Sequence, residues 1–112
     1  MTQTAKEYDV FQAIADPTRR EVLRLLAEKQ RPIADITSHF DMTRTAVAKH
    51  LFILSEAGLI KGEKVGREKR YQLQPEPLAD LQEWLSYFDL FWTNKLSVLK
   101  YLAEAEEGKT SE

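Results

Sequence analysis

The sequence has no cysteine, only two histidines, four glycines and four prolines in 112 residues. Without cysteine it forms no disulfide, offers no thiolate to a metal and has no cysteine nucleophile. It also lacks an apolar run of the roughly 20 residues that a membrane-spanning helix needs, and residues 1–9 lack the apolar segment of a secretory signal. These absences predict a cytoplasmic protein without membrane contact.

The remaining composition is that of a globular protein, with 43% hydrophobic and 30% charged residues. These proportions exclude disordered and fibrous classes. A chain of 112 residues has the size of one domain with a modest core. We therefore expect residues 1–112 to form a single domain.

Charge is unevenly distributed along the chain, whose net charge is −2. Residues 1–40 hold six Lys or Arg and six Asp or Glu, residues 41–74 hold seven against four, and residues 75–112 hold three against eight. A partner meets the local charge rather than the total. The acidic total therefore does not exclude a basic footprint for nucleic acid in the middle segment.

Apolar spacing predicts two helices in the first quarter of the chain. Residues 5–14 repeat apolar side chains at helical spacing. Asp16 is a good N-cap and Pro17 suits the first helical position, where its missing N–H is not needed. A second helix is therefore expected over residues 17–28.

A short helix, a turn and a longer helix are predicted next. The short helix covers residues 33–39 and the turn residues 40–42. Thr43 caps a helix that runs to residue 56 with apolar side chains at spacings of three and four. Gly58 supplies the left-handed residue that ends it.

The hydrophobic period then changes from helical to alternating, which predicts a β-hairpin over residues 59–74. Residues 64–66 are expected to form its turn, and the second strand to begin at Arg67. Pro75 and Pro77 prevent the strand from continuing, because each proline lacks the N–H of a strand ladder.

A long last helix is predicted over residues 77–106, followed by a disordered polar tail over residues 107–112. Its apolar residues follow a heptad-like spacing over about 45 Å, more than one small domain covers, so a second subunit is the expected cover. A ligand pocket among its aromatic residues is the alternative. The predicted dimer contacts, from the first and last helices, are Tyr8, Phe11, Leu81, Trp84, Leu85, Phe88, Phe91, Trp92 and Leu99.

This order of elements predicts a winged helix-turn-helix fold, mainly α with a β-hairpin wing, that dimerises through its first and last helices. In such folds the second helix of the motif enters the major groove of DNA, and the wing contacts flanking backbone or the minor groove. The predicted DNA contacts are Thr43, Arg44, Thr45, Ala48, Lys49 and His50 in the helix, and Lys64, Arg67, Lys69 and Arg70 in the hairpin.

Each of these residues also has an interpretation without DNA. Arg44 and Lys49 could be solvated helix residues, and His50 could pack at the end of a helix or bond to backbone. The hairpin cations could protect an exposed sheet edge, and Arg19 and Arg20 could form surface ion pairs with Asp16, Glu21 or Asp35. For the whole chain the alternatives are a winged-helix protein-interaction module, or a repressor controlled by a partner protein or small ligand at the aromatic helix.

Three segments resemble the ArsR/SmtB-type bacterial regulators: residues 15–23 (ADPTRREVL), 42–60 (MTRTAVAKHLFILSEAGLI) and 66–71 (GREKRY). The resemblance covers about residues 8–75. It implies a homodimer that binds a palindromic operator of double-stranded DNA and usually represses transcription. It also implies that positions 44, 45, 48 and 49 face bases, although Arg44 and Ala48 replace the glutamine and serine that are frequent in that family.

Metal-sensing members of that family carry a cysteine pair in the helix equivalent to residues 33–39, or carboxylate and histidine ligands in the last helix. This sequence has neither, so it resembles the non-metal branch, and no metal or other cofactor is expected. No carboxylate stands in a recognisable catalytic motif with histidine, serine or a phosphate-binding loop, so no enzymatic activity is expected. The sequence identifies no effector.

Overall fold

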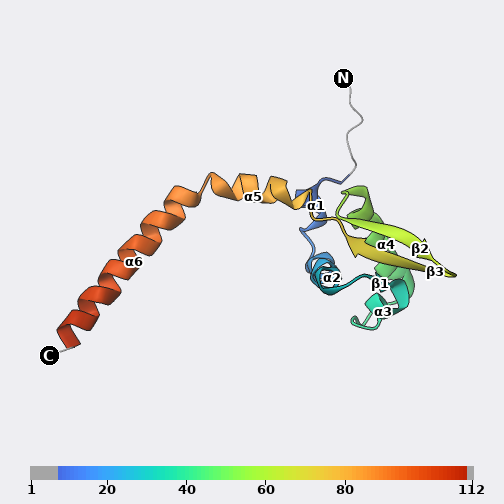
Figure 1. Cartoon of the computed structure of the whole chain (residues 1–112), viewed down its shortest axis with the longest axis horizontal. Coiled ribbons are helices and arrows are strands. Elements are labelled where there is room, and N and C mark those ends of the chain that lie inside the picture. The colour runs from blue at the N-terminus through green and yellow to red at the C-terminus, as the bar shows by residue number, and fades with distance from the viewer. Residues whose placement is uncertain (1–7, 111–112) are drawn as a thin grey trace, which may run out of the picture. The chain divides into compact units, whose positions relative to one another are not determined.

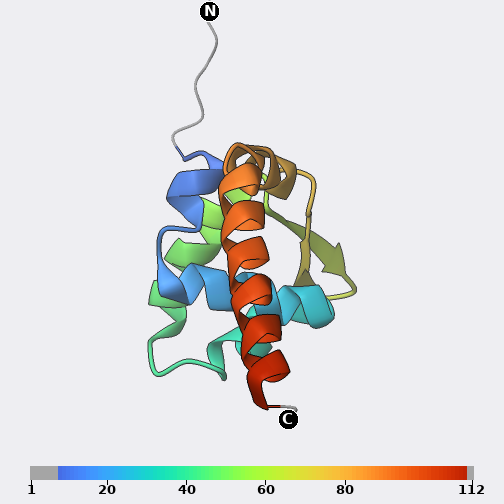
Figure 2. The same ribbon diagram turned by 90° about the vertical axis from the view of Figure 1, so that its left-hand side faces the viewer.

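The computed structural model describes the backbone of residues 8–110, and the side chains of these residues apart from 93–94 and 107–110. Contacts divide the chain into two units, one ending at Leu81 and the other beginning at Gln82. The first unit contains the short helices, the sheet and the buried core (Figures 1 and 2). The expected single domain over residues 1–112 stays a prediction.

The first helix, α1 (Val10–Ala13), is shorter than the predicted helix over residues 5–14. Asp9 and Gln12 form a reciprocal cap: each side chain accepts a hydrogen bond of 2.8 Å from the backbone N–H of the other. Asp9 has an extended backbone, so the helix begins after it. Residues 5–7, where the prediction begins, lie outside the described residues.

The second helix, α2 (Pro17–Glu28), has the predicted bounds. The carboxylate of Asp16 accepts the backbone N–H of Arg19 at 3.1 Å, and Pro17 occupies the first turn. The apolar stripe of α2 is buried in the core: Val22, Leu23, Leu25 and Leu26.

A two-residue strand, β1 (Arg31–Pro32), precedes α3 (Ile33–Thr37). The sequence pattern did not predict this strand, and α3 ends two residues before the predicted His39. The longer helix α4 (Arg44–Glu56) is confirmed, together with its Thr43 cap. Gly58 has φ +77°, and the N–H of Leu59 bonds back to Leu54 O at 3.0 Å, which closes the C-terminus as predicted.

Strands β2 (Ile60–Val65) and β3 (Glu68–Leu73) form the predicted hairpin, and the sheet order is β1-β3-β2. Val65 pairs with Glu68, so Gly66 and Arg67 form the turn. The predicted turn over residues 64–66 therefore starts two residues and ends one residue before the observed turn. Gly66 has φ +65°, a conformation that glycine adopts without steric cost and that starts the tight turn there.

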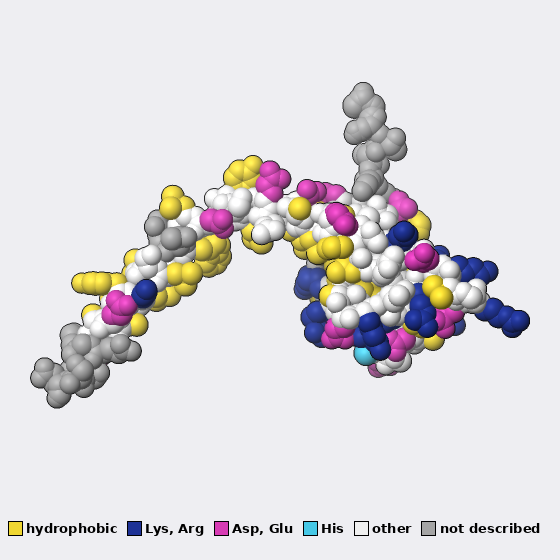
Figure 3. Space-filling model, viewed as in Figure 1, with side chains coloured by type: hydrophobic (Ala, Val, Ile, Leu, Met, Phe, Trp, Pro, Cys, Tyr) yellow, Lys and Arg dark blue, Asp and Glu magenta, His cyan; other side chains and the backbone are white. Residues whose placement is uncertain are grey.

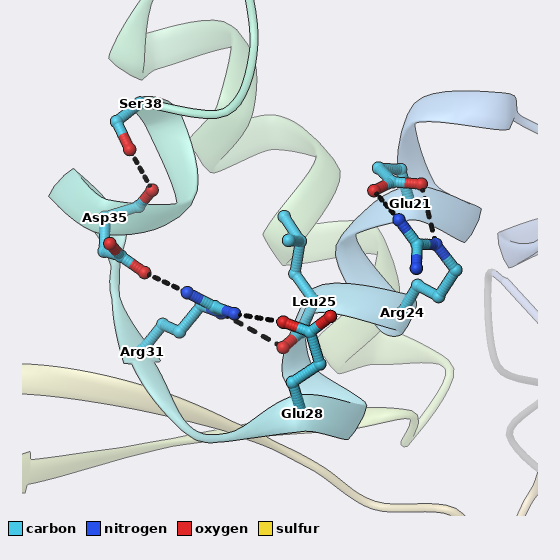
Figure 4. A network of polar contacts seen from close by, with 7 residues as sticks. All are labelled: Glu21, Arg24, Leu25, Glu28, Arg31, Asp35 and Ser38. Carbon is cyan, nitrogen blue, oxygen red and sulfur yellow. Dashed lines mark hydrogen bonds and ion pairs between the residues drawn. The ribbon is translucent and has the colours of Figure 1, made fainter.

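Arg31 connects α2, β1 and α3 through one buried guanidinium group (Figure 4). Its Nε donates to the Leu25 carbonyl at 3.0 Å, and its two terminal nitrogens reach Glu28 at 2.6 Å and Asp35 at 2.7 Å. The hydrogen bond from Arg31 lowers the pKa of the Asp35 carboxyl below 3.8. In addition, Arg31 pairs with Tyr71 of β3, so the same residue joins the helices to the hairpin.

The predicted single helix over residues 77–106 is wrong in one respect: the chain forms two helices, α5 (Leu78–Ser86) and α6 (Asp89–Thr110). At the break, Tyr87 and Phe88 bond to carbonyls three residues back, at 3.2 and 2.9 Å. The Ser86 hydroxyl donates to the Glu83 carbonyl at 2.6 Å, which competes with the helical pattern. The helix also continues to Thr110, beyond the predicted tail boundary, and residues 111–112 lie outside the described residues.

Candidate DNA interface

The exposed face of α4 carries most of the predicted DNA contacts. On the inner face, Val47, Leu51 and Leu54 are buried, with at most 2% of their surface exposed. Because the helix turns about every 3.6 residues, the other side faces solvent, with exposed Arg44, Thr45, Ala48 and Lys49. In the described part of the chain, the Arg44 and Lys49 side chains form no hydrogen bond or ion pair, so their charges are available to a partner.

Thr43 caps the helix that presents these residues. Its Oγ1 accepts the N–H of Ala46 at 3.1 Å, and its backbone is extended. The capped end leaves other α4 N–H groups at the same terminus, where the helix dipole favours an anion. Thr43 thus has a structural role, while its predicted contact with DNA stays a prediction.

His50 lies on the flank of α4 that faces α2. Its Nδ1 is 3.2 Å from Nη1 of Arg19 and 3.9 Å from the Asp16 carboxylate. Because a guanidinium group only donates, Nδ1 accepts this bond. His50 thus bonds to an arginine side chain of α2 through one ring nitrogen, and its predicted contact with DNA stays a prediction.

Arg19 and Arg20 hold the end of α1 rather than forming the expected ion pairs with acids. The Nε of Arg19 donates to Ala13 O at 2.7 Å, and Nη1 of Arg20 donates to Ile14 O at 2.7 Å. Orphan carbonyls at a helix end are satisfied in this way. Together with the bond to His50, they tie α1, α2 and α4 to each other.

The four predicted hairpin cations lie in different surroundings. Lys64 and Arg67 are exposed at and beside the turn, where dark-blue side chains gather in Figure 3. Arg70 forms an ion pair with Glu68 at 2.7 Å. Lys69 does not extend to the tip; its Nζ lies over the Tyr71 ring, 5.5 Å from the centroid.

A hollow of about 540 Å³ joins the start of α4 to the hairpin. Three of the predicted contacts from separate segments line it: Arg44 from α4, and Arg67 and Lys69 from the hairpin. Pro32, Ile33 and Ala34 form another wall. The fold therefore brings together cations that are more than 20 residues apart in the sequence.

Comparisons with known proteins agree with this geometry. The sequence profile described as "Bacterial regulatory protein, arsR family" matches residues 16–61. The transcriptional repressor SdpR of Bacillus subtilis is 36% identical over 80 residues, which cover 71% of this chain and 89% of SdpR. The chain belongs to the ArsR family. It is thus a winged helix-turn-helix transcriptional regulator, not an enzyme.

Solved structures of ArsR-type regulators share the fold. An ArsR-like transcriptional regulator from Rhodococcus sp. RHA1 is 33% identical with a TM-score of 0.67, covering 86% of this chain and 88% of that one. A homodimeric winged helix-turn-helix DNA-binding domain from Mycobacterium bovis is 26% identical with a TM-score of 0.58, covering 82% and 80%. The predicted winged helix-turn-helix fold, mainly α with a β-hairpin, is therefore confirmed, while dimerisation through the first and last helices stays a prediction.

This ArsR-family chain also exposes an aromatic residue that the sequence analysis missed. Phe52 is 56% exposed on α4, one turn after Lys49. It lines a hollow of about 380 Å³ with Tyr8, Thr45 and Lys49, among others. In the sequence, Phe52 could have been found as a bulky apolar residue on the otherwise polar face of this helix. At such a position an aromatic side chain can contact a thymine methyl group.

The predicted dimer contacts divide between the two units. Leu81 packs against the core, Tyr8 is half-buried, and Phe11 is 39% exposed. In the second unit the predicted contacts are all exposed, and yellow side chains follow α6 in Figure 3. These are Trp84, Leu85, Phe88, Phe91, Trp92 and Leu99.

The described residues contain neither a cluster of metal ligands nor a helix that could span a membrane. No group of three or more His, Cys, Asp or Glu side chains there is placed to hold a metal ion. None of the helices within that part of the chain combines the length and apolar character needed to cross a bilayer.

Proposed function

We propose that this ArsR-family regulator is a repressor that binds a palindromic operator as a homodimer. Helix α4 would lie in the major groove and the β2–β3 hairpin on flanking backbone. The observation that carries the proposal is the exposed face of α4, with Arg44 and Lys49 free of ion pairs among the described residues, beside a hairpin with exposed cations. The relative SdpR is described as a transcriptional repressor, which supports repression rather than activation.

The residues on α4 suit base recognition. Arg44 lies in the first turn, and its planar guanidinium group can donate two hydrogen bonds to guanine. Thr45 can contact a thymine methyl group, and the small Ala48 allows the helix to approach the bases closely. These residues would supply sequence specificity, and the hairpin would supply affinity through phosphates.

The apolar surface of α6 supports the homodimer. Phe91 is 52%, Trp92 54% and Leu99 61% exposed, and large exposed apolar patches mark interaction surfaces. A second copy offers the same face, as two-fold symmetry requires. The Mycobacterium bovis relative is described as homodimeric. Two copies of α4 related by a two-fold axis would read half-sites about 34 Å apart, one turn of DNA.

The first test selects bound fragments from a genomic DNA pool and measures their affinity by fluorescence anisotropy. A recovered palindrome, with affinity that falls steeply as salt rises, is the expected result. A repressor should also reduce transcription in vitro from a promoter that contains the recovered site. Failure to bind any duplex at low salt would favour the protein-interaction module instead.

The second test compares Arg44→Ala with Arg67→Ala. Loss of a bidentate base contact should weaken the recovered operator by about 1 to 3 kcal/mol, with a smaller effect on random duplex. Loss of a phosphate contact should weaken both duplexes equally. Arg24→Ala is the matched control, because Arg24 pairs with Glu21 on α2 and should leave both affinities unchanged. If Arg44→Ala weakened operator and random duplex to the same extent, base recognition by Arg44 would be wrong.

A further inference from the structure

The Lys69 side chain lies along the hairpin instead of extending from it. It turns back along β3 and places its ammonium 5.5 Å from the centroid of the Tyr71 ring. Lys64, which faces it in the hairpin register, has no such ring contact in the described structure. Two lysines at equivalent positions of the same hairpin therefore present their charges differently.

Gly62 makes this course possible. A Cβ at Gly62 would lie only 2.4 Å from Cε of Lys69 and 3.2 Å from Cε1 of Tyr71. Gly62 does not have a positive φ, so its backbone conformation is open to other residues. The missing side chain matters because the Lys69 stem occupies its space.

This course brings Lys69 to the junction between the hairpin and α4. Lys69 lines the hollow of about 540 Å³ with Arg44 and Arg67. It also lines a second hollow of about 240 Å³, whose other walls include Ala48 and Ser55 of α4. Lys64 lines neither hollow.

The charges of the larger hollow favour an anion. Arg44 and Arg67 form no side-chain hydrogen bond or ion pair within the described residues, and Lys69 has only its ring contact. The single carboxylate that lines the hollow, Glu68, is already bonded to Arg70 at 2.7 Å. Three cations thus line the hollow, and the only acid among its lining residues is paired with an arginine outside it.

We propose that Lys69, Arg44 and Arg67 together bind one phosphate group of the duplex backbone at the junction of α4 and the hairpin. Gly62 keeps the space through which Lys69 reaches this position, and Tyr71 supports the ammonium there. Arg44 would thereby also contact the backbone beside the bases that it reads. This inference rests on the proposed DNA binding. It adds a defined phosphate site in which the uncharged Gly62 is a positioning residue.

The test measures affinity for a random-sequence duplex as salt is raised, because phosphate contacts do not depend on sequence. Loss of the whole phosphate contact lowers the salt slope by about 0.9 per subunit, which for the dimer amounts to about 10-fold in affinity between about 50 and 200 mM salt. Lys69→Gln leaves Arg44 and Arg67 at the phosphate, so it should lower the salt slope by a measurable part of that amount. Gly62→Ala keeps every charge but displaces Lys69, and should reduce the salt slope similarly. Thermal unfolding of each variant shows whether it is folded.

Double variants separate positioning from a general effect on the hairpin. Gly62→Ala should add nothing in a Lys69→Gln background, since the charge that it displaces is already absent. In a Lys64→Gln background its effect should persist in full. If Gly62→Ala is unstable, Tyr71→Leu replaces it, because removal of the ring also withdraws support from Lys69.

The outcomes distinguish this inference from the proposed function. Wild-type protein that binds no duplex would overturn the proposed function. Wild-type binding with an unchanged salt slope for Lys69→Gln would overturn the phosphate site alone. An additive effect of Gly62→Ala and Lys69→Gln would overturn the positioning role of Gly62.

Discussion

Leu99→Ala is the sharpest test of the dimer, because α6 offers a matched control. Leu99 belongs to the heptad-like stripe with Leu85, Phe88 and Trp92 and is 61% exposed, whereas Leu90 lies between the stripe positions and is 72% exposed. Full burial of a leucine side chain stabilises by about 1.5 to 3 kcal/mol. Burying the exposed part of Leu99 in both subunits would therefore contribute about 2 to 4 kcal/mol to the dimer.

Leu99→Ala would remove this contribution, so the dimer dissociation constant should increase roughly 30- to 700-fold. Sedimentation equilibrium over a concentration series measures the constant directly. Leu90→Ala removes the same atoms from the same helix and should leave it unchanged. Equal effects of the two substitutions, or a monomeric wild-type protein throughout the series, would refute the role assigned to the stripe.

Two further predictions concern the fold that supports the interface. Thr43→Ala removes the α4 cap and should lower the free energy of unfolding by about 1 kcal/mol in urea titrations, whereas an unchanged midpoint would show that Ala46 N–H finds another partner. For Asp35, the bond from Arg31 lowers the folded-state pKa below 3.8, so its stabilisation is present above about pH 4 and is lost as pH falls through the folded value. Asp35→Asn should therefore lower the thermal midpoint at pH 7, and the difference from wild type should shrink below about pH 4; a constant difference would contradict this assignment.

The features that the sequence predicted well are those with local causes. The Asp16 and Thr43 caps act on N–H groups three residues away, and Gly58 acts on its own backbone. The apolar period of α4 also separates its buried side from its exposed side without reference to the rest of the chain. For this reason the position of the candidate interface on α4 follows from the sequence alone.

The features that were missed depend on contacts between distant residues or on competition at a helix end. β1 exists because Arg31 and Pro32 pair with β3, some 40 residues later. The contact between Gly62 and Lys69 depends on the hairpin register. The break between α5 and α6 interrupts an apolar pattern that continues through it, so hydrophobic spacing alone did not reveal it.

Within the candidate site, residue type indicated which side chains carry charge but not where the charge lies. Lys64, Lys69 and Arg70 look alike in the sequence, yet Lys69 covers a tyrosine ring and Arg70 is paired with Glu68. His50 is engaged by Arg19 from another helix. These differences come from side-chain packing across elements, which local patterns do not encode.

The buried guanidinium of Arg31 has a consequence for the evolution of this regulator. Its three nitrogens lie in one plane and donate to acceptors of Leu25, Glu28 and Asp35. A lysine would preserve the charge but concentrate it at a single tetrahedral nitrogen, which cannot reproduce that planar fork. Position 31 is therefore constrained by shape as well as charge, and even the most conservative exchange there would loosen the attachment of α3 to α2.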